Sequence, residues 1–371
     1  MDGGIRMNML DYLDWRGDLT FATDGINEID ALIFAWLSYY RFENLDGVQL
    51  DGLTLTQLAE LHERINGPFQ EHPLKTSILP SPSAEWLLRC ASRTQRFASV
   101  RVCDFTNVVD HENSSQFAAI SFLIGEEFRV IAYRGTDASV AGWKEDCYLS
   151  FLDAVPAQIL GLRYLEDRED GRRVLLCGHS KGGNLAVYAA LHATEKRLAD
   201  IMWVYNFDGP GFCVDMFNEK HYKRIQERVW TIIPESSVVG MLLEHDEDYR
   251  IVESKKAGLL QHSAMCWQVR GRHFVYSEKL NESSVLLDKA LRSWIKGMSN
   301  EDRRDFVEAI FAIIESTGAK QLTELSDNIL KNSKKMLATA NSLDPNQKKM
   351  AHLLLKELVR AAKSELLPSR G

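Results

Sequence analysis

A glycine-flanked serine in the middle of the chain has the spacing of a hydrolase nucleophile. Residues 178–183 read Gly-His-Ser-Lys-Gly-Gly, which matches the pattern G-x-S-x-G around Ser180. In that pattern the serine stands at the tip of a sharp strand-to-helix turn. Side chains two positions away on either side would collide, so glycine occupies both positions. The following helix directs its first N–H groups toward the oxyanion of acyl transfer. The spacing therefore predicts Ser180 as a catalytic nucleophile.

The residues around this pentapeptide agree with that interpretation. Val174–Cys177 is a short apolar run, as in a buried parallel strand, and residues 184–191 are apolar and strongly helical. The alternative is an ordinary glycine-rich turn between a strand and a helix, which five residues alone do not exclude. A phosphate-binding loop is excluded, because it needs lysine after its second glycine and Lys181 precedes that glycine.

A second turn supplies candidates for the oxyanion hole. Residues 133–137 read Tyr-Arg-Gly-Thr-Asp and directly follow an apolar strand. An oxyanion hole takes one backbone N–H from the residue after the nucleophile, here Lys181, and a second from a loop at the end of an earlier strand. We predict that Thr136 provides the second N–H and that its hydroxyl can add a third donor. Without Ser180, the same residues would be interpreted as a plain turn.

The general base is expected to be a histidine that follows the serine in the chain. Hydrolases with G-x-S-x-G on a strand-to-helix turn carry their triad in the order serine, acid, histidine. Five histidines satisfy that order: His192, His221, His245, His262 and His273. His262 follows the predicted strand 249–252 by a short loop, where this fold carries its base, so we predict that it activates Ser180. His273 is the second candidate, and the other three fall at helical or surface positions.

Two carboxylates compete for the role of triad acid. Asp208 ends the strand directly after the nucleophile strand, and Glu235 ends the next one. An acid at a strand end after the nucleophile can orient the histidine. We choose Asp208 and keep Glu235 as the alternative. Asp208 also has a non-catalytic interpretation, in which it ties down the Gly-Pro-Gly turn at 209–211. Asp137, Trp143 and Asp146 are predicted to shape the site without direct chemistry.

The elements that must position these residues follow the pattern of an α/β fold. Strands and helices alternate through the middle of the chain, which favours a largely parallel sheet covered on both faces. Gly-Glu-Glu at 125–127 predicts a tight hairpin between two early strands. We therefore predict an α/β-hydrolase fold. The expected strands are 100–108, 117–124, 128–133, 174–177, 201–207, 229–233 and 249–252, and the expected helical stretches between them are 138–168, 181–195 and 215–227.

The two ends of the chain are predicted to be helical. Asn27, with Asp30 three residues later, predicts a capped helix toward residue 40, and further helices are expected at 55–65 and 84–95. We assign residues 1–282 to the hydrolase domain, with 41–85 as a cap over the pocket. Residues 283–371 are assigned to a C-terminal helical region that can contact a protein partner. Its expected helices are 284–297, capped 301–316, 322–340 and 347–366.

Composition narrows the class of protein. The 371 residues are 45% hydrophobic and 26% charged, with a formal net charge of −8, which argues against a nucleic-acid-binding surface. Six cysteines without a C-x-x-C pair predict reduced thiols. The N-terminus lacks the apolar core of a signal peptide, and the apolar stretch 31–40 is too short to span a bilayer. We expect a soluble cytoplasmic protein that needs no metal or organic cofactor.

The motifs together resemble a known family. Residues 133–136, Trp143, Asp146 and 178–183 resemble the class 3 lipase pattern. The stretches 15–18, 206–212, 236–243 and 261–262 are more similar to the bacterial Mbeg-like family, a domain of unknown function related to those lipases. The resemblance covers nearly the whole chain and implies an α/β-hydrolase fold. Class 3 lipases usually carry an apolar residue where this chain has Lys181, and this departure counts against an ordinary triglyceride substrate.

These observations predict hydrolysis of carboxylic esters through an acyl-enzyme on Ser180, as in lipases, esterases or lysophospholipases. A small-molecule or lipid ester is the expected substrate. Two alternatives remain open at this point. One is a catalytically inactive protein of this fold that binds a partner through its helical tail, and the other is an acyltransferase with an acceptor other than water.

Overall fold

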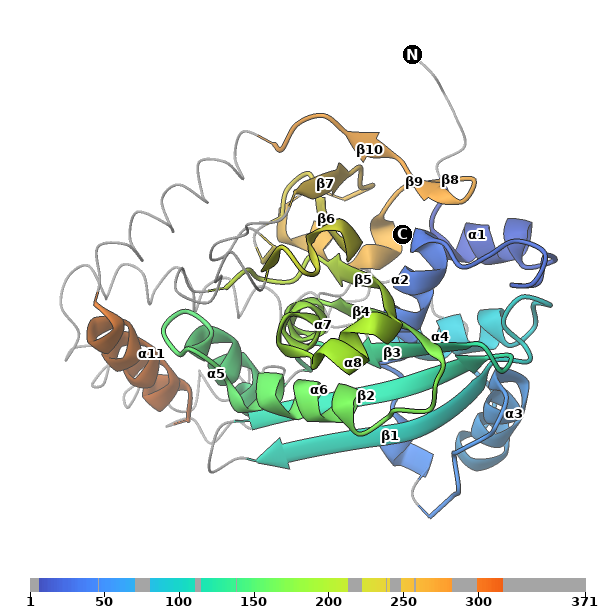
Figure 1. Ribbon diagram of the computed structural model, residues 1–371, viewed down its shortest axis with the longest axis horizontal. Coiled ribbons are helices and arrows are strands. Elements are labelled where there is room, and N and C mark those ends of the chain that lie inside the picture. The colour runs from blue at the N-terminus through green and yellow to red at the C-terminus, as the bar shows by residue number, and fades with distance from the viewer. Residues whose placement is uncertain are drawn as a thin grey trace.

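The computed structural model describes residues 7–45, 47–70, 81–110, 115–137, 139–212, 222–237, 239–240, 248–256, 258–281 and 299–315. The described strands form one eight-stranded sheet in the order β1-β2-β3-β4-β5-β6-β7-β10 (Figure 1). β1, β2 and β3 pair antiparallel, β3 to β7 run parallel, and β10 is antiparallel to β7. The strands are β1 (Arg101–Asp110), β2 (Ser115–Ile124), β3 (Phe128–Tyr133), β4 (Arg173–His179), β5 (Ile201–Phe207), β6 (Val229–Pro234), β7 (Tyr249–Val252) and β10 (Tyr276–Ser277).

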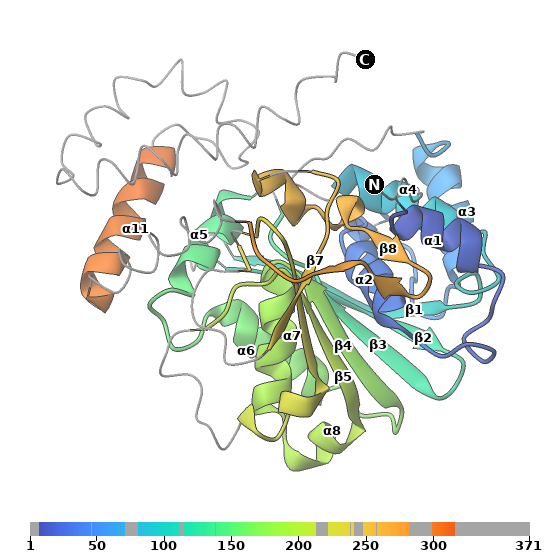
Figure 2. The ribbon, with the colours of Figure 1, turned by 90° about the horizontal axis from the view of Figure 1, so that it is seen from above.

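Helices cover both faces of this sheet, which is the α/β-hydrolase architecture predicted above. Figure 2 shows α1 (Met9–Arg16), α2 (Glu28–Leu37) and α4 (Ser81–Ala91) on one side. It shows α5 (Val140–Tyr148), α6 (Pro156–Glu166), α7 (Lys181–His192) and α8 (Glu195–Asp200) on the other. Strand residues alternate between the two apolar layers: Leu175 and Cys177 pack toward α2, and Val174 and Leu176 pack toward α7. This period of two lets β4 carry buried apolar side chains on both faces.

Most predicted strands lie within a few residues of the observed ones. The hairpin at 125–127 is confirmed, because Ile124 pairs with Phe128 and Gly125 has a φ of 57°. The predicted stretch 138–168 is two helices, since Pro156 starts a new one. The predicted helix 181–195 ends at His192, and α8 follows. The predicted helix at 215–227 falls mostly outside the described residues, and its end overlaps a short 3₁₀ turn, Gln226–Arg228.

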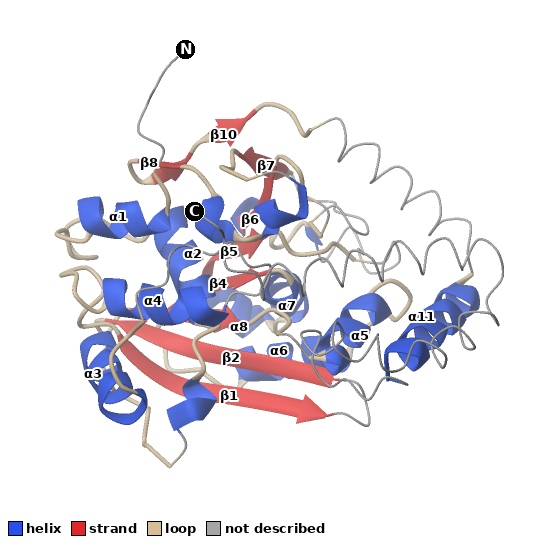
Figure 3. Cartoon of the chain, turned by 180° about the vertical axis from the view of Figure 1, so that it is seen from behind, coloured by secondary structure: helices blue, strands red, loops and turns tan. Residues whose placement is uncertain are grey.

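Short elements escaped the sequence patterns. α1 lies in the lead-in segment, and its eight residues are capped by Asn8. β8 (Val269–Arg270) and β9 (His273–Phe274) form a two-stranded hairpin with only two residues each (Figure 1). Figure 3 shows β8 beside α1. Stretches of this length carry too few residues to display a period. The predicted helix 84–95 begins earlier, at Ser81, and ends earlier, at Ala91.

The capping prediction for α2 is confirmed. The Asn27 side chain accepts the N–H of Ile29 and Asp30, and Asp30 accepts the N–H of Asn27 in return. Asp30 also pairs with Arg96 at 2.5 Å, and neither side chain is exposed. The N-terminal helices are therefore tied to the segment that leads into β1.

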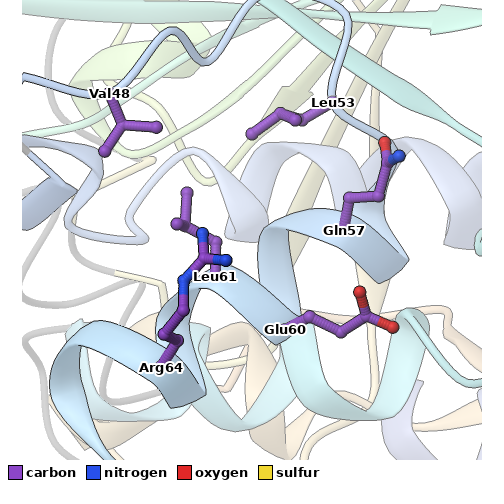
Figure 4. A pocket seen from close by; sticks show the side chains of 6 residues that line it. All are labelled: Val48, Leu53, Gln57, Glu60, Leu61 and Arg64. Atoms are coloured by element: carbon purple, nitrogen blue, oxygen red, sulfur yellow. The ribbon is translucent and has the colours of Figure 1, made fainter.

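The described part of 41–85 lies largely along the outer edge of the sheet. Thr54 bridges to Arg101, which the register places level with the start of β4 and so opposite to the Ser180 end. A pocket of about 220 Å³ lies there, between α3 (Leu55–Asn66) and the loop before it (Figure 4). Its lining residues are Val48, Leu53, Gln57, Glu60, Leu61 and Arg64. Residues 71–80 of the predicted cap lie outside the described residues.

One helix of the predicted C-terminal region is described. α11 (Asn300–Glu315) begins after Ser299, whose hydroxyl and N–H both bond to Asp302, as its predicted cap requires. It lies beside α5, where Glu308 pairs with Lys144 at 2.9 Å (Figure 1). The predicted helices 284–297, 322–340 and 347–366 fall outside the described residues. Among those described, no helix is long and apolar enough to cross a lipid bilayer.

Candidate active site

Ser180 stands on a strained turn between β4 and α7. Its φ of 57° and ψ of −136° lie in a region that costs on the order of 1–3 kcal/mol for a residue with a side chain. The glycines around it are in close contact: a Cβ on Gly178 would overlap the backbone of Gly182, and one on Gly182 would overlap the carbonyl of Tyr133. The glycines of the pattern are therefore required by space. Ser180 is half-buried, and its N–H donates to the carbonyl of Phe207 on β5 at 2.9 Å.

His262 and Asp208 form a hydrogen-bonded pair near this turn. His262 Nδ1 lies 2.6 Å from Asp208 Oδ2. The other carboxylate oxygen, Oδ1, accepts the Ser237 hydroxyl at 2.5 Å and the Gly240 N–H at 3.1 Å. Asp208 is fully buried and has a φ of 51°. Each oxygen of the carboxylate therefore has a donor, and the ring of His262 is fixed by its Nδ1 side.

The alternative candidates lie elsewhere. Glu235 is half-buried, and within the described residues its backbone N–H donates to the Val252 carbonyl and its carbonyl accepts the Asn281 N–H. His273 is on β9, with an exposed side chain that pairs with Glu28 at 3.4 Å. His192 is at the far end of α7, against Tyr188. His221 and His245 fall outside the described residues. The structure thus brings Asp208, and neither Glu235 nor His273, together with His262.

The turn at 209–211 does not depend on the Asp208 carboxylate. The Gly209 N–H donates to Asn206 Oδ1 at 3.0 Å, and the Asn184 side chain donates to the carbonyls of Pro210 and Gly211. Two asparagines hold this turn. Within the described residues, no hydrogen bond joins the Ser180 hydroxyl to His262. Such bonds are often long until substrate is bound.

The loop after β3 lies directly against the serine. A Cβ on Gly135 would come within 3.1 Å of the Ser180 Cβ. Lys181 is the first residue of α7, so its N–H has no acceptor within the helix. The Thr136 hydroxyl donates to Asp146, at 2.8 and 2.6 Å from its two oxygens. The hydroxyl proton is therefore engaged, and the loop has its backbone N–H groups to offer in place of the hydroxyl donor predicted above.

The Lys181 side chain is buried beneath this loop. Its Nζ contacts the Gln116 carbonyl and Glu145 Oε2, both at 2.9 Å, and Asp146 Oδ1 at 3.7 Å. Burial alone would lower the pKa of Lys181, but the two carboxylates outweigh it and raise the pKa above its ordinary value. Burial raises the pKa of Asp146 to about 6, against the opposing charge of Lys181. The lysine thus joins β2 and α5 to the elbow, the turn at residues 178–183 between β4 and α7 that carries Ser180.

Two neighbours of the site were not singled out by sequence reasoning. His179 precedes the serine, is fully buried, and has its Nε2 2.7 Å from the His262 carbonyl. Tyr39, at the end of α2, has its hydroxyl 3.0 Å from His179 Nδ1. The only signal for His179 was its place inside the pentapeptide. Tyr39 carried none, because it lies 140 residues away in the chain.

Comparison with known proteins supports the family that the motifs resemble. A search of curated proteins finds no match. Among solved structures, the crystal structure of M37 lipase is similar at 17% identity and a TM-score of 0.36, over 57% of this chain and 68% of that chain. The model of the Mbeg1-like family matches residues 91–312, more than half of the chain, and spans the elbow, Asp208 and His262. The chain belongs to the Mbeg1-like family.

Proposed function

We propose that this protein is a serine hydrolase that cleaves carboxylic esters through an acyl-enzyme on Ser180. The observation that carries the proposal is the buried Asp208–His262 pair, 2.6 Å apart, close to a serine held at positive φ. A strained serine beside an oriented imidazole is the arrangement that nucleophilic catalysis requires. Strain of this kind persists where the surrounding structure enforces it, and it concentrates at functional sites.

Each proposed step uses a group already described. Asp208 accepts the Nδ1–H of His262, which leaves Nε2 to take the proton of Ser180. The serine oxygen attacks the ester carbonyl, and the N–H groups of Lys181 and Thr136 stabilise the oxyanion. His262 returns the proton to the leaving alcohol. Water, activated by the same imidazole, then releases the acid and frees Ser180.

A fluorophosphonate probe tests this proposal, because it labels an activated serine without requiring knowledge of the substrate. Ser180→Ala should abolish labelling. His262→Gln and Asp208→Asn should slow it by about 10³- to 10⁴-fold, as losses of a base or its orienting acid do. Glu235→Gln is the matched control, since it neutralises the other candidate acid, and it should label like the wild type.

The outcomes separate the alternatives as well. Failure of the wild type to label at any pH from 6 to 9 would contradict the enzyme and favour a binding protein. A slow Glu235→Gln variant and a normal Asp208→Asn variant would reverse the assignment of the acid. A series of nitrophenyl esters of increasing acyl length then defines the substrate class. Added alcohol acceptors that divert the acyl group from water would indicate an acyltransferase.

A further inference from the structure

The buried hydroxyl of Tyr39 contacts two of the segments that form the site and is linked to the third through the His179 ring. It is 3.0 Å from His179 Nδ1 and 3.2 Å from the His179 carbonyl, on the elbow strand. A Cβ on Gly135 would overlap the same hydroxyl, so the oxyanion loop lies directly against it. On the other side of the His179 ring, Nε2 is 2.7 Å from the carbonyl of His262. One tyrosine and one histidine therefore connect α2, the oxyanion loop, the elbow and the segment with the base.

The chemistry of these partners fixes the direction of both hydrogen bonds. A carbonyl oxygen can only accept, so His179 Nε2 must carry a proton and donate it to His262. Burial lowers the pKa of His179 well below its ordinary value, so the ring is neutral. A neutral ring protonated at Nε2 has an unprotonated Nδ1, which accepts the Tyr39 hydroxyl at 3.0 Å and shares that hydroxyl's one proton with the His179 carbonyl at 3.2 Å. The Tyr39 hydroxyl and the His179 Nε2–H are therefore both engaged as hydrogen-bond donors.

The surroundings leave the His179 ring little freedom. Trp36 meets it edge to face with centroids 4.9 Å apart, and the His262 ring lies 4.5 Å away at an interplanar angle of 39°. Tyr39 and His179 are both almost fully buried. The bond to the His262 carbonyl fixes the backbone of the residue whose side chain bonds to Asp208. The position of the imidazole is thus determined from two sides, through its backbone and through Nδ1.

We infer that Tyr39 and His179 are positioning residues, which hold the His262 segment against the Ser180 elbow. The inference rests on the proposed hydrolase function for its kinetic consequence, but its geometric content is independent of activity. A displacement of about 1 Å at a reacting group can cost about a hundredfold in rate. Loss of the hydrogen bonds from Tyr39 to His179 and from His179 to His262 should therefore lower kcat and leave KM unchanged.

The adjacent residue provides a matched control. Tyr40 is also buried, and its hydroxyl lies 2.8 Å from the Nδ1 of another histidine, His62, on α3. Tyr39→Phe and Tyr40→Phe therefore each remove a hydroxyl bonded to an imidazole, and only the first touches the site. With a nitrophenyl ester, Tyr39→Phe should lower kcat at least tenfold, whereas Tyr40→Phe should stay within about twofold of the wild type.

A pair of variants at His179 separates the donor from the volume of the ring. His179→Gln keeps an N–H that can reach the His262 carbonyl, and His179→Met fills a similar volume without a donor. Gln should retain at least tenfold more kcat than Met, with similar thermal unfolding midpoints. Equal activity of the two variants, or equal losses in Tyr39→Phe and Tyr40→Phe, would overturn the inference.

A measurement without turnover distinguishes this inference from the proposed function. Nitrogen-15 NMR of the imidazole rings reports the tautomer of each histidine. At neutral pH, His179 should be neutral with its proton on Nε2, and it should be so in Tyr40→Phe as well. In Tyr39→Phe the signal of the His262 Nδ1 proton, shared with Asp208, should shift or broaden. A His179 ring that titrates near pH 6.5 or carries its proton on Nδ1 would contradict the inference, even in an enzyme that labels normally.

Discussion

Among the described residues, two ion pairs have no exposed side-chain surface, and they lie in different regions of the molecule. Arg96–Asp30 lies among the N-terminal helices, at 2.5 Å, and Lys181–Glu145 lies beneath the elbow, at 2.9 Å. Arg96 also donates to the carbonyls of Leu19, Asp24 and Gly25. Each of the three guanidinium nitrogens of Arg96 therefore donates to a carboxylate or carbonyl oxygen, as a buried charge requires. This first pair fixes the scaffold.

The Lys181–Glu145 pair lies next to Ser180, and one polar atom beside it has no hydrogen bond within the described residues. Glu145 accepts the N–H groups of Gln116 and Ala157 in addition to Lys181. Within the described residues, the Gln116 Nε2 beside this pair has no hydrogen-bond partner. The neighbouring Asp146 connects the lysine to Thr136 in the oxyanion loop. The comparison teaches that similar buried charges can stabilise a scaffold in one place and shape a reactive loop in another.

The largest expected effect is on the scaffold pair. Arg96→Met leaves Asp30 buried without its partner, so the free energy of unfolding should fall by about 3–5 kcal/mol. Urea unfolding monitored by tryptophan fluorescence measures this loss. The protein that remains folded should react with the fluorophosphonate probe at the wild-type rate, because Arg96 does not touch the site. A loss below about 1 kcal/mol would show that the pair contributes little to the fold.

Lys181→Met should lower both stability and reactivity. Glu145 loses its cation, which costs about 3 kcal/mol, and the elbow loses its link to Asp146 and the oxyanion loop. The double variant Lys181→Met/Glu145→Gln removes the unpaired charge, so at least half of the lost stability should return. The labelling rate should stay low, because Thr136 and Asp146 remain without the lysine. Recovery of stability and labelling together would erase the distinction between the two pairs.

The two regions should respond to pH in opposite directions. Asp146 is held protonated up to about pH 6, above its unfolded value near 4, so the stability it contributes is present below pH 4 and lost as the pH rises through 6. The free energy of unfolding of the wild type minus that of Asp146→Asn should therefore decrease from pH 4 to 7. Chemical denaturation at a series of pH values measures it.

Asp24, in the scaffold, provides the matched comparison. Its burial is outweighed by hydrogen bonds and charges from Arg16 and Arg272, which lower its pKa. Its contribution to stability is present above the unfolded value and lost as the pH falls through the folded pKa. The free energy of unfolding of the wild type minus that of Asp24→Asn should increase with pH between about 2 and 5. Equal signs for the two variants would contradict the assignment.

The smallest expected effect is at a helix cap next to the scaffold pair. Asn27→Ala removes the cap of α2 and should cost about 1 kcal/mol, within the usual range for N-caps. The Asn27 side chain also donates to Tyr12, which bonds to Asp30. Thr54→Ala at the cap of α3 is the control, because Thr54 has no contact with that network. Asn27→Ala should therefore cost more than Thr54→Ala.

Local spacing predicted the features of the fold that local physics determines. The elbow, the α2 cap and the 125–127 hairpin depend on residues within a few positions of one another, so their sequence patterns were sufficient. The order of triad residues left five histidines and two carboxylates, and their positions after the predicted strands favoured Asp208 and His262, which the structure brings within hydrogen-bond distance. These are patterns that a single chain displays without any knowledge of tertiary contacts.

Contacts between distant segments could not be predicted in this way. Lys181 was noted for its backbone N–H and for its departure from class 3 lipases, but its partner Glu145 is 36 residues away. Tyr39 reaches His179 across 140 residues. The sequence predicted the Thr136 hydroxyl as an oxyanion donor, because its hydrogen bond to Asp146, ten residues away, is not visible in the sequence. Such pairings depend on how helices pack onto the sheet, which the hydrophobic pattern alone leaves undetermined.

The Asp208 carboxylate comes from β5, whereas the donors that surround it, Ser237 and Gly240, follow β6. The carboxylate and its hydrogen-bond donors are thus supplied by segments that follow different strands. A slip of register between β5 and β6 would therefore separate the carboxylate from its donors and leave a buried oxygen without a partner.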